Sequence, residues 1–117
     1  METLCKIRDM YRSLMAFEAH FQKKYAICLN EGMLLCSLKR SPQLSSGEIA
    51  ALLGLTASNA SKVICQAEKK TLIRRMLGEA DKRQMYFELT EKGHQLIVEI
   101  KSDEKEMSGL VDEIINK

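Results

Sequence analysis

The sequence predicts a mainly α-helical chain of 117 residues with one small β hairpin, an α+β fold in a single domain. Apolar residues recur at three- and four-residue steps near both ends of the chain, which indicates long amphipathic helices there. Between residues 46 and 70, two shorter helical patterns are separated by a glycine. From Gln84 to Leu89, apolar and polar residues alternate, as they do in a half-buried strand.

Composition and charge place the chain among ordinary globular proteins. It is 45% hydrophobic and 29% charged, with a net charge of +2, and it is long enough for one core but too short for two domains. No apolar run approaches the roughly 18 residues of a membrane span, and the N-terminal segment mixes acids with bases, so we expect neither a membrane segment nor a signal peptide. The bases gather between residues 56 and 86 and the acids after residue 91, which favours an anionic partner for the middle of the chain.

The first helix is expected over about Thr3–Lys24. Its apolar stripe comprises Leu4, Ile7, Tyr11, Leu14, Phe21 and Tyr25. A second, short helix is expected to begin at Asn30-Glu31-Gly32 and to end before Pro42, because proline fixes its own φ and disfavours helical geometry in the preceding residue. We expect this helix to be buried nearly all round, through Met33, Leu34, Leu35, Cys36 and Leu38. Leu44 then fits a short strand that pairs with the hairpin.

The segment from Ser46 to about Lys70 predicts two helices joined by a tight turn. Ser46 is a suitable N-cap for the first helix, and Gly54 suits its end because glycine adopts the left-handed conformation without a Cβ clash. Thr56 or Ser58 would cap the second helix. A small residue at Ala50, four positions before the glycine, is the spacing of a helix-turn-helix.

The second of these helices has two distinguishable faces. Apolar residues at the 3.6-residue period should pack inward, namely Ala60, Val63, Ile64 and Ala67. The opposite face and its flanks are small, polar and basic: Ser58, Asn59, Ser61, Lys62, Cys65, Gln66 and Lys69. Short side chains, amides and cations are what a helix needs in the DNA major groove. The alternative is a solvated helix face without a partner.

A hairpin follows this helix directly. Its first strand starts at Leu72-Ile73, and its second runs from Gln84 to Leu89 with Met85, Phe87 and Leu89 on one side. The loop between them, Gly78 to Arg83, is too charged to be buried. A basic hairpin tip beside such a helix is a wing suited to the DNA minor groove. The fold predicted is therefore a winged helix-turn-helix; a local ion pair between Asp81 and Arg83 is the simpler alternative for the loop.

Two short motifs carry a resemblance to a known family. Asp81-Lys82-Arg83, followed by Leu89-Thr90-Glu91-Lys92-Gly93, is similar to the wing-to-helix signature of the MarR family of winged-helix transcriptional regulators, and the resemblance extends over about Tyr25 to Ile97. It implies a homodimer that binds a pseudo-palindromic double-stranded DNA operator. It also implies release by a small phenolic or anionic effector or by cysteine oxidation. By the same resemblance, Arg83 would enter the minor groove and Asp81 would brace the wing.

The chain departs from the family pattern at two positions. Thr71 stands where a glycine commonly follows the recognition helix, and a β-branched residue is poor in the left-handed conformation, so we expect a different turn there. Ala57 stands where a basic or larger polar residue is frequent near the start of that helix. The contacts that the family makes with bases are therefore not all expected here.

The two ends of the chain are expected to form the dimer interface. Thr90 should cap the last helical segment, which carries apolar residues to the end of the chain with a break or bend expected at Asp103-Glu104 or Gly109. Residues 1–28 and 94–117 would be dimerisation helices, and residues 29–93 the winged-helix lobe. The alternative is that the first and last helices pack against each other within one chain.

Nothing in the sequence indicates an enzyme, a metal site or a cofactor. His20 and His94 stand alone, and the four cysteines lack metal-like or paired spacing, which favours free thiols in a reducing bacterial cytoplasm. Cys5 resembles in position the peroxide-sensing cysteine of one branch of the family, and Cys65 lies on the outer face of the recognition helix. Both are candidate redox residues; buried, inert thiols are the commoner case.

We therefore expect a cytoplasmic, homodimeric, sequence-specific DNA-binding regulator, most simply a repressor modulated by a small molecule. The expected DNA-contacting residues are Thr56, Ser58, Asn59, Ser61, Lys62, Gln66, Lys69, Arg74, Arg75, Asp81, Lys82 and Arg83. Two alternatives stay open: a winged helix used as a protein-interaction or adaptor module, and a cysteine-based redox regulator. The sequence fixes neither the operator, the effector nor its pocket.

Overall fold

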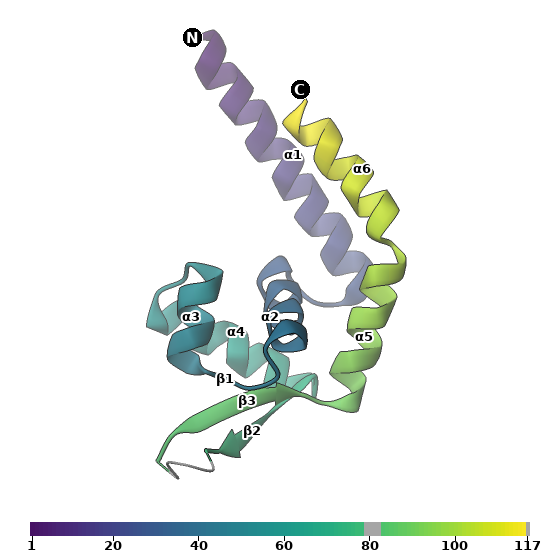
Figure 1. Cartoon of the computed structure of the whole chain (residues 1–117). Helices are drawn as coiled ribbons and strands as arrows, with labels where there is room; N and C mark the ends of the chain where they lie inside the picture. The colour runs from purple at the N-terminus through teal and green to yellow at the C-terminus, as the bar shows by residue number, and fades with distance from the viewer. Residues whose placement is uncertain (79–82, 117) are drawn as a thin grey trace. The chain divides into compact units, whose positions relative to one another are not determined.

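The computed structural model describes residues 1–78 and 83–116. Six helices and three strands lie in these ranges: α1 (Glu2–Tyr25), α2 (Leu29–Arg40), β1 (Leu44–Ser45), α3 (Ser46–Leu53), α4 (Ala57–Lys69), β2 (Ile73–Leu77), β3 (Met85–Leu89), α5 (Glu91–Ser102) and α6 (Glu104–Ile115). They form two compact units (Figure 1). We call Asn30–Val98 the winged-helix unit, and Met1–Leu29 together with Glu99–Lys117 the helix-pair unit.

The winged-helix unit contains one three-stranded antiparallel sheet of order β1-β3-β2. Phe87 of β3 lies opposite Leu44 of β1 on one side and Arg75 of β2 on the other. The short strand expected at Leu44 is confirmed. The alternation expected in β3 holds from Tyr86 to Leu89, since Phe87 and Leu89 are buried while Glu88 is partly exposed, but Met85 is 38% exposed. Strands β2 and β3 therefore form the predicted hairpin, which follows α4 in the sequence.

Helices α2, α3 and α4 supply most of the core of the winged-helix unit. Their most deeply buried side chains are Leu34, Leu35, Leu38, Ile49, Ala60, Ile64 and Ala67. The prediction that α2 is buried nearly all round is wrong, because Met33 is 46% exposed and Cys36 is also exposed. Only one face of α2 packs inward. That face includes a charged residue, Glu31, which the sequence did not predict to be buried.

In the helix-pair unit, α1 and α6 lie side by side and antiparallel, with both chain ends at the same end of the pair (Figure 1). The break expected at Asp103 is confirmed, since α5 ends at Ser102 and α6 begins at Glu104. Gly109 lies inside α6 without interrupting it. Among the described residues, none of the helices is both long enough and apolar enough to cross a bilayer.

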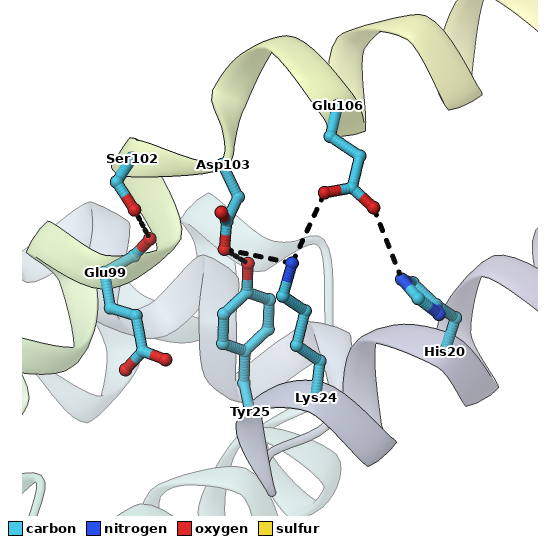
Figure 2. Close-up of polar contacts among 7 residues, drawn as sticks. All are labelled: His20, Lys24, Tyr25, Glu99, Ser102, Asp103 and Glu106. Atoms are coloured by element: carbon cyan, nitrogen blue, oxygen red, sulfur yellow. Dashed lines mark hydrogen bonds and ion pairs between the residues drawn. The ribbon is translucent and has the colours of Figure 1, made fainter.

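A polar cluster joins α1 to the start of α6 (Figure 2). The Tyr25 hydroxyl donates to the Asp103 carboxylate, and Lys24 Nζ lies 3.2 Å from Asp103 Oδ2 and 3.4 Å from Glu106 Oε2. The bond from Tyr25, with a second from Lys24, lowers the pKa of Asp103. Desolvation, followed by the bond to Asp103, raises the pKa of Tyr25 to about 12. At neutral pH the carboxylate is therefore ionised and the phenol is neutral.

Large apolar side chains remain on the surface of the helix-pair unit. Of the predicted apolar stripe on α1, Phe21 and Tyr25 are buried, whereas Leu4, Ile7, Tyr11 and Leu14 are 63%, 56%, 65% and 49% exposed. A separate groove of about 340 Å³ lies between α1 and α6 and is lined in part by Phe17, Leu110 and Ile114. Packing within the chain thus covers only one end of the stripe.

Candidate nucleic-acid interface

The first helix of the helix-turn-helix is α3, and a capping box fixes its start. The Glu48 amide donates to Ser45 Oγ (3.2 Å), while the Ser45 amide donates back to Glu48 Oε1 (3.0 Å). The bond from the Ser45 amide lowers the pKa of Glu48. The N-cap is therefore Ser45, and the prediction of Ser46 is wrong. The sequence carried this signal, because only Ser45 has a glutamate three residues later.

The turn between α3 and α4 has the expected geometry. Gly54 adopts the left-handed conformation with φ of 65°, and the Leu55 amide donates to the Ala50 carbonyl at 2.9 Å. Thr56 caps α4, because its Oγ1 accepts from the Asn59 amide at 3.1 Å. The Thr56 side chain is thus engaged in the cap, which limits what it can offer to a ligand.

The two faces predicted for α4 are both observed. The inward face, Ala60, Val63, Ile64 and Ala67, is buried. Every polar residue expected on the outer face is exposed: Ser58, Asn59, Ser61, Lys62, Gln66 and Lys69. Lys62 and Lys69 have no ion-pair partner within residues 1–78 and 83–116. The outer face of α4 is therefore a polar surface with two available cations.

Carboxylates hold both arginines of β2. Arg75 bonds the Glu68 carboxylate in a bidentate pair, Nε to Oε2 at 2.8 Å and Nη2 to Oε1 at 3.0 Å, and lies over the Phe87 ring. Arg74 Nε pairs with Glu88. The sequence did not predict these pairs. They neutralise Glu68, the only acid of α4, but any contact of either arginine with a phosphate would compete with its own carboxylate.

The wing tip is described in part. Arg83 is exposed at the start of the returning segment. Asp81 and Lys82, the other two wing residues predicted to bear on DNA, lie outside the described residues. Lys62 and Arg83 are thus both on the surface of the winged-helix unit, as a role in binding a polyanion requires.

A partly buried ion pair anchors the end of α4, and sequence reasoning missed it. Lys70 Nζ lies 2.8 Å and 3.0 Å from the two carboxylate oxygens of Glu31, whose side chain is 2% exposed. Glu31 lies in the first turn of α2, where the helix dipole favours an anion. Lys70 therefore serves the fold. Lys70 is one of the bases gathered between residues 56 and 86, but its charge is paired within the fold.

The turn after α4 corrects a second prediction. Thr71 does adopt the left-handed conformation, with φ of 60°, although it is β-branched. The Leu72 amide donates to the Ala67 carbonyl (3.0 Å) and the Thr71 amide to the Glu68 carbonyl (2.9 Å), which is a Schellman ending. The turn is thus the usual one, formed at a conformational cost of about 1–2 kcal/mol by a residue other than glycine.

Thr90 and Gly93 place the start of α5 in contact with this turn. Thr90 Oγ1 accepts from the Gly93 amide at 3.1 Å, which confirms the predicted cap. A Cβ on Gly93 would lie 2.2 Å from the Leu72 carbonyl oxygen, so only glycine fits there. The spacing of Gly93 after Leu89 and Thr90 is the signal of this close contact in the sequence.

The four cysteines are free thiols. Cys5 and Cys65 are exposed free thiols, Cys36 is exposed and Cys28 partly so. Within the described ranges, no three His, Cys, Asp or Glu residues gather closely enough to hold a metal ion. The thiols of Cys5 and Cys65 are thus accessible, which is a requirement for the redox alternative.

These features define the class of protein. A helix-turn-helix, α3 and α4, is followed by a β hairpin, and the short strand β1, which precedes α3 in the chain, pairs with that hairpin; this arrangement is a winged helix-turn-helix. The family model that matches the sequence over residues 27–85 is that of the MarR family. The chain belongs to the MarR family.

Relatives of known name agree with this assignment. The transcriptional repressor MprA of Escherichia coli is 28% identical over 76 residues, which are 62% of this chain and 43% of MprA. The chain thus spans less than half the length of that curated relative. The Staphylococcus aureus MepR–DNA complex is similar with a TM-score of 0.71 at 25% identity, covering 94% of this chain and 91% of that one. The regulator BldR of Sulfolobus solfataricus has the same fold, with a TM-score of 0.77, 24% identity and coverage of 99% and 81%.

Proposed function

We propose that the protein is a dimeric regulator of transcription that binds a pseudo-palindromic operator in double-stranded DNA through α4 and the wing. The observation that carries the proposal is the outer face of α4. It presents short polar side chains, two amides and two lysines, and its only carboxylate is neutralised by Arg75. A helix with these properties matches the major groove in size, hydrogen bonding and charge.

Each polar residue has a distinct part in this proposal. Ser58, Asn59, Ser61, Lys62 and Gln66 would face base edges or line the groove, and Lys69, Arg74, Arg75 and Lys82 would hold phosphates. Arg83 would enter the minor groove, where the potential over A·T-rich sequence attracts arginine. Arg74 and Arg75 would contribute less than Lys62 or Lys69, because each already bonds a carboxylate.

The helix-pair unit supports the dimeric part of the proposal. Its exposed apolar residues Leu4, Ile7, Tyr11 and Leu14 lie along one face of α1, and an uncovered apolar helix face of this kind marks an interaction site. A second copy would cover it with the same surface. Two α4 helices would then lie about 34 Å apart, one turn of B-DNA. Residues 1–28 and 94–117 would serve dimerisation, and residues 29–93 DNA binding.

The exposed face of α4 argues against an adaptor module. Protein-docking surfaces carry aromatic or large apolar anchors, and α4 exposes none. Redox regulation is the second candidate, because Cys65 is an accessible thiol among the proposed DNA contacts. Oxidation or alkylation there would add bulk to the face that enters the groove. Small-molecule control, with a phenolic or anionic effector, and the direction of regulation (most simply repression) follow the family resemblance alone.

Titration of the dimer with a labelled duplex from the DNA upstream of its own gene, at 50 and 200 mM salt, tests the proposal. We expect affinity to fall by orders of magnitude between the two salt concentrations, because several phosphates are neutralised. Arg83→Ala should weaken binding without changing the melting temperature, since Arg83 is exposed. Full affinity of that variant, or the same affinity at both salt concentrations, would contradict the proposal.

A further inference from the structure

The end of α4 and the start of α5 are bonded to each other. We call residues 70–72 with residues 90–93 the α4–α5 joint. The Thr90 amide donates to the Leu72 carbonyl at 3.0 Å, and Thr90 Oγ1 donates to the Thr71 carbonyl at 2.6 Å. Because Gly93 leaves no room between its backbone and the Leu72 carbonyl, the two segments are in direct contact. The joint therefore holds the last residues of α4 to the first turn of α5.

Lys92 is the charged residue of this joint. Its Nζ donates to the Lys70 carbonyl at 2.9 Å and lies 3.5 Å from Thr71 Oγ1. Lys70 is the C-cap of α4, where carbonyls lack helical partners and the helix dipole is negative. The Lys70 carbonyl also accepts from Thr71 Oγ1 at 2.6 Å, so the ammonium group adds a second bond to it and complements the dipole. Lys92 thus acts on the recognition helix from a different helix.

Lys70 is held from a second direction as well. The backbone carbonyl of Lys70 accepts from Lys92, and the Nζ of Lys70 donates to the buried Glu31 carboxylate in α2. The C-terminal end of α4 is thus fixed between α2 and α5. The outer face of α4, by contrast, makes few contacts and is left for a ligand.

Small movements of this end would be magnified along the helix. α4 has 13 residues and is therefore about 20 Å long. A tilt of about 5° at its C-terminal end would move its other end by nearly 2 Å, which is enough to break a hydrogen bond to a base edge. Contacts with phosphates, made by long flexible lysines, would tolerate the same movement.

We infer that Lys92 is a positioning residue for sequence recognition. It fixes the angle of α4 through the Lys70 carbonyl and so sets the preference for the operator without contacting DNA itself. The inference rests on the proposed function, because it requires that α4 reads DNA. It differs from a phosphate-contact role for Lys92, which would affect all DNA sequences equally.

The test uses the full chain with Lys92→Met, Lys92→Arg and the control Lys101→Met, which removes an exposed lysine of α5 that bonds no carboxylate in the described ranges. Affinity is measured by fluorescence anisotropy for the upstream duplex and for a scrambled duplex of equal length, over a range of salt. We expect Lys92→Met to lose roughly tenfold on the upstream duplex only. The salt slope should be unchanged, Lys92→Arg should recover most of the affinity, and Lys101→Met should match the wild type.

Three results would overturn the inference. An equal loss on both duplexes, with a salt slope smaller by about one, would make Lys92 a phosphate contact. Unchanged affinity of Lys92→Met would show that its bond has no effect on recognition. Unchanged amide exchange at Thr90 and Leu72 in DNA-free Lys92→Met would show that it does not hold the joint. Failure of the proposed function is seen separately, as a wild-type protein that binds neither duplex or both equally.

Discussion

The two units of the molecule place their apolar and charged residues differently. In the winged-helix unit, the inward face of α4, Ile49 of α3 and one face of α2 are buried, and the cations of α4 are exposed. In the helix-pair unit, the contact between α1 and α6 is largely polar near Tyr25 and Asp103, whereas Leu4, Ile7 and Tyr11 are exposed. The first unit holds most of the buried core residues, while the second leaves most of the apolar stripe of α1 exposed.

This difference indicates separate roles for the same kind of element. A helix whose apolar face is already buried can present its polar face to a ligand, as α4 does. A helix whose apolar face is exposed is stabilised by acquiring a partner, as α1 would be. Substitutions of one residue type should therefore have different effects in the two units, and four comparisons test this.

The largest expected effect is that of Gly93→Ala. The added Cβ would lie 2.2 Å from the Leu72 carbonyl oxygen, so the α4–α5 joint must open or the unit must unfold. We expect a loss of about 3 kcal/mol or more in the free energy of unfolding.

Gly109→Ala is the matched control in α6, where the new Cβ meets nothing within 4 Å. It should instead stabilise the chain by about 0.5–1 kcal/mol. Urea denaturation measures both; equal effects would refute the comparison.

Placing a charge on an exposed apolar residue should affect assembly only in the helix-pair unit. Leu14→Glu, at a side chain 49% exposed, should raise the dissociation constant of the proposed dimer by on the order of a hundredfold. Met33→Glu, at a side chain 46% exposed in the winged-helix unit, should leave assembly unchanged. Sedimentation velocity distinguishes them. A dimer that tolerates Leu14→Glu would place the interface elsewhere.

Thr71→Gly should stabilise the winged-helix unit modestly. Thr71 has φ of 60°, which costs a β-branched residue about 1–2 kcal/mol and costs glycine little. Loss of the Thr71 hydroxyl bond to the Lys70 carbonyl offsets part of the gain, so we expect a net increase of about 0.5–1 kcal/mol in the free energy of unfolding. A destabilised variant would mean that the hydroxyl contributes more than the strain removes.

The smallest effect concerns pH and the helix-pair unit. The pKa of Asp103 is lowered in the folded chain, mainly by the bond from Tyr25. Its stabilising contribution is therefore present above the unfolded value near 4 and is lost as pH falls through the lower folded value. Wild type should melt at a higher temperature than Asp103→Asn at pH 7, and the difference should vanish in acid.

The raised pKa of Tyr25, about 12, implies the opposite direction: its contribution is complete below about pH 10 and is lost toward pH 12.

Local signals in the sequence predicted the winged-helix unit well. The left-handed conformation of Gly54 and the cap supplied by Thr56 define the turn between α3 and α4. The alternation around Phe87 determines which side of β3 is buried. Both features follow from a few neighbouring residues. The exposure of the predicted recognition residues follows in turn from the buried stripe on α4. What remains a prediction is their contact with DNA.

Two of the features that were missed depend on residues far apart in the chain. Glu31 looks like a surface residue at a helix start, and only its distance to Lys70, 39 positions later, shows why it is buried. The left-handed conformation of Thr71 is supported by bonds that Thr90 and Lys92 supply. No pattern within one helix or turn reports such pairings.

The central claim is that the outer face of α4 binds duplex DNA, and a charge reversal at Lys62 tests it most directly. Lys62 is exposed on that face and has no ion-pair partner in the described part of the chain. Anisotropy titration of Lys62→Glu with the upstream duplex should show a loss of at least tenfold in affinity, while circular dichroism and melting stay as in the wild type. Wild-type affinity in Lys62→Glu, with the fold intact, would contradict the account.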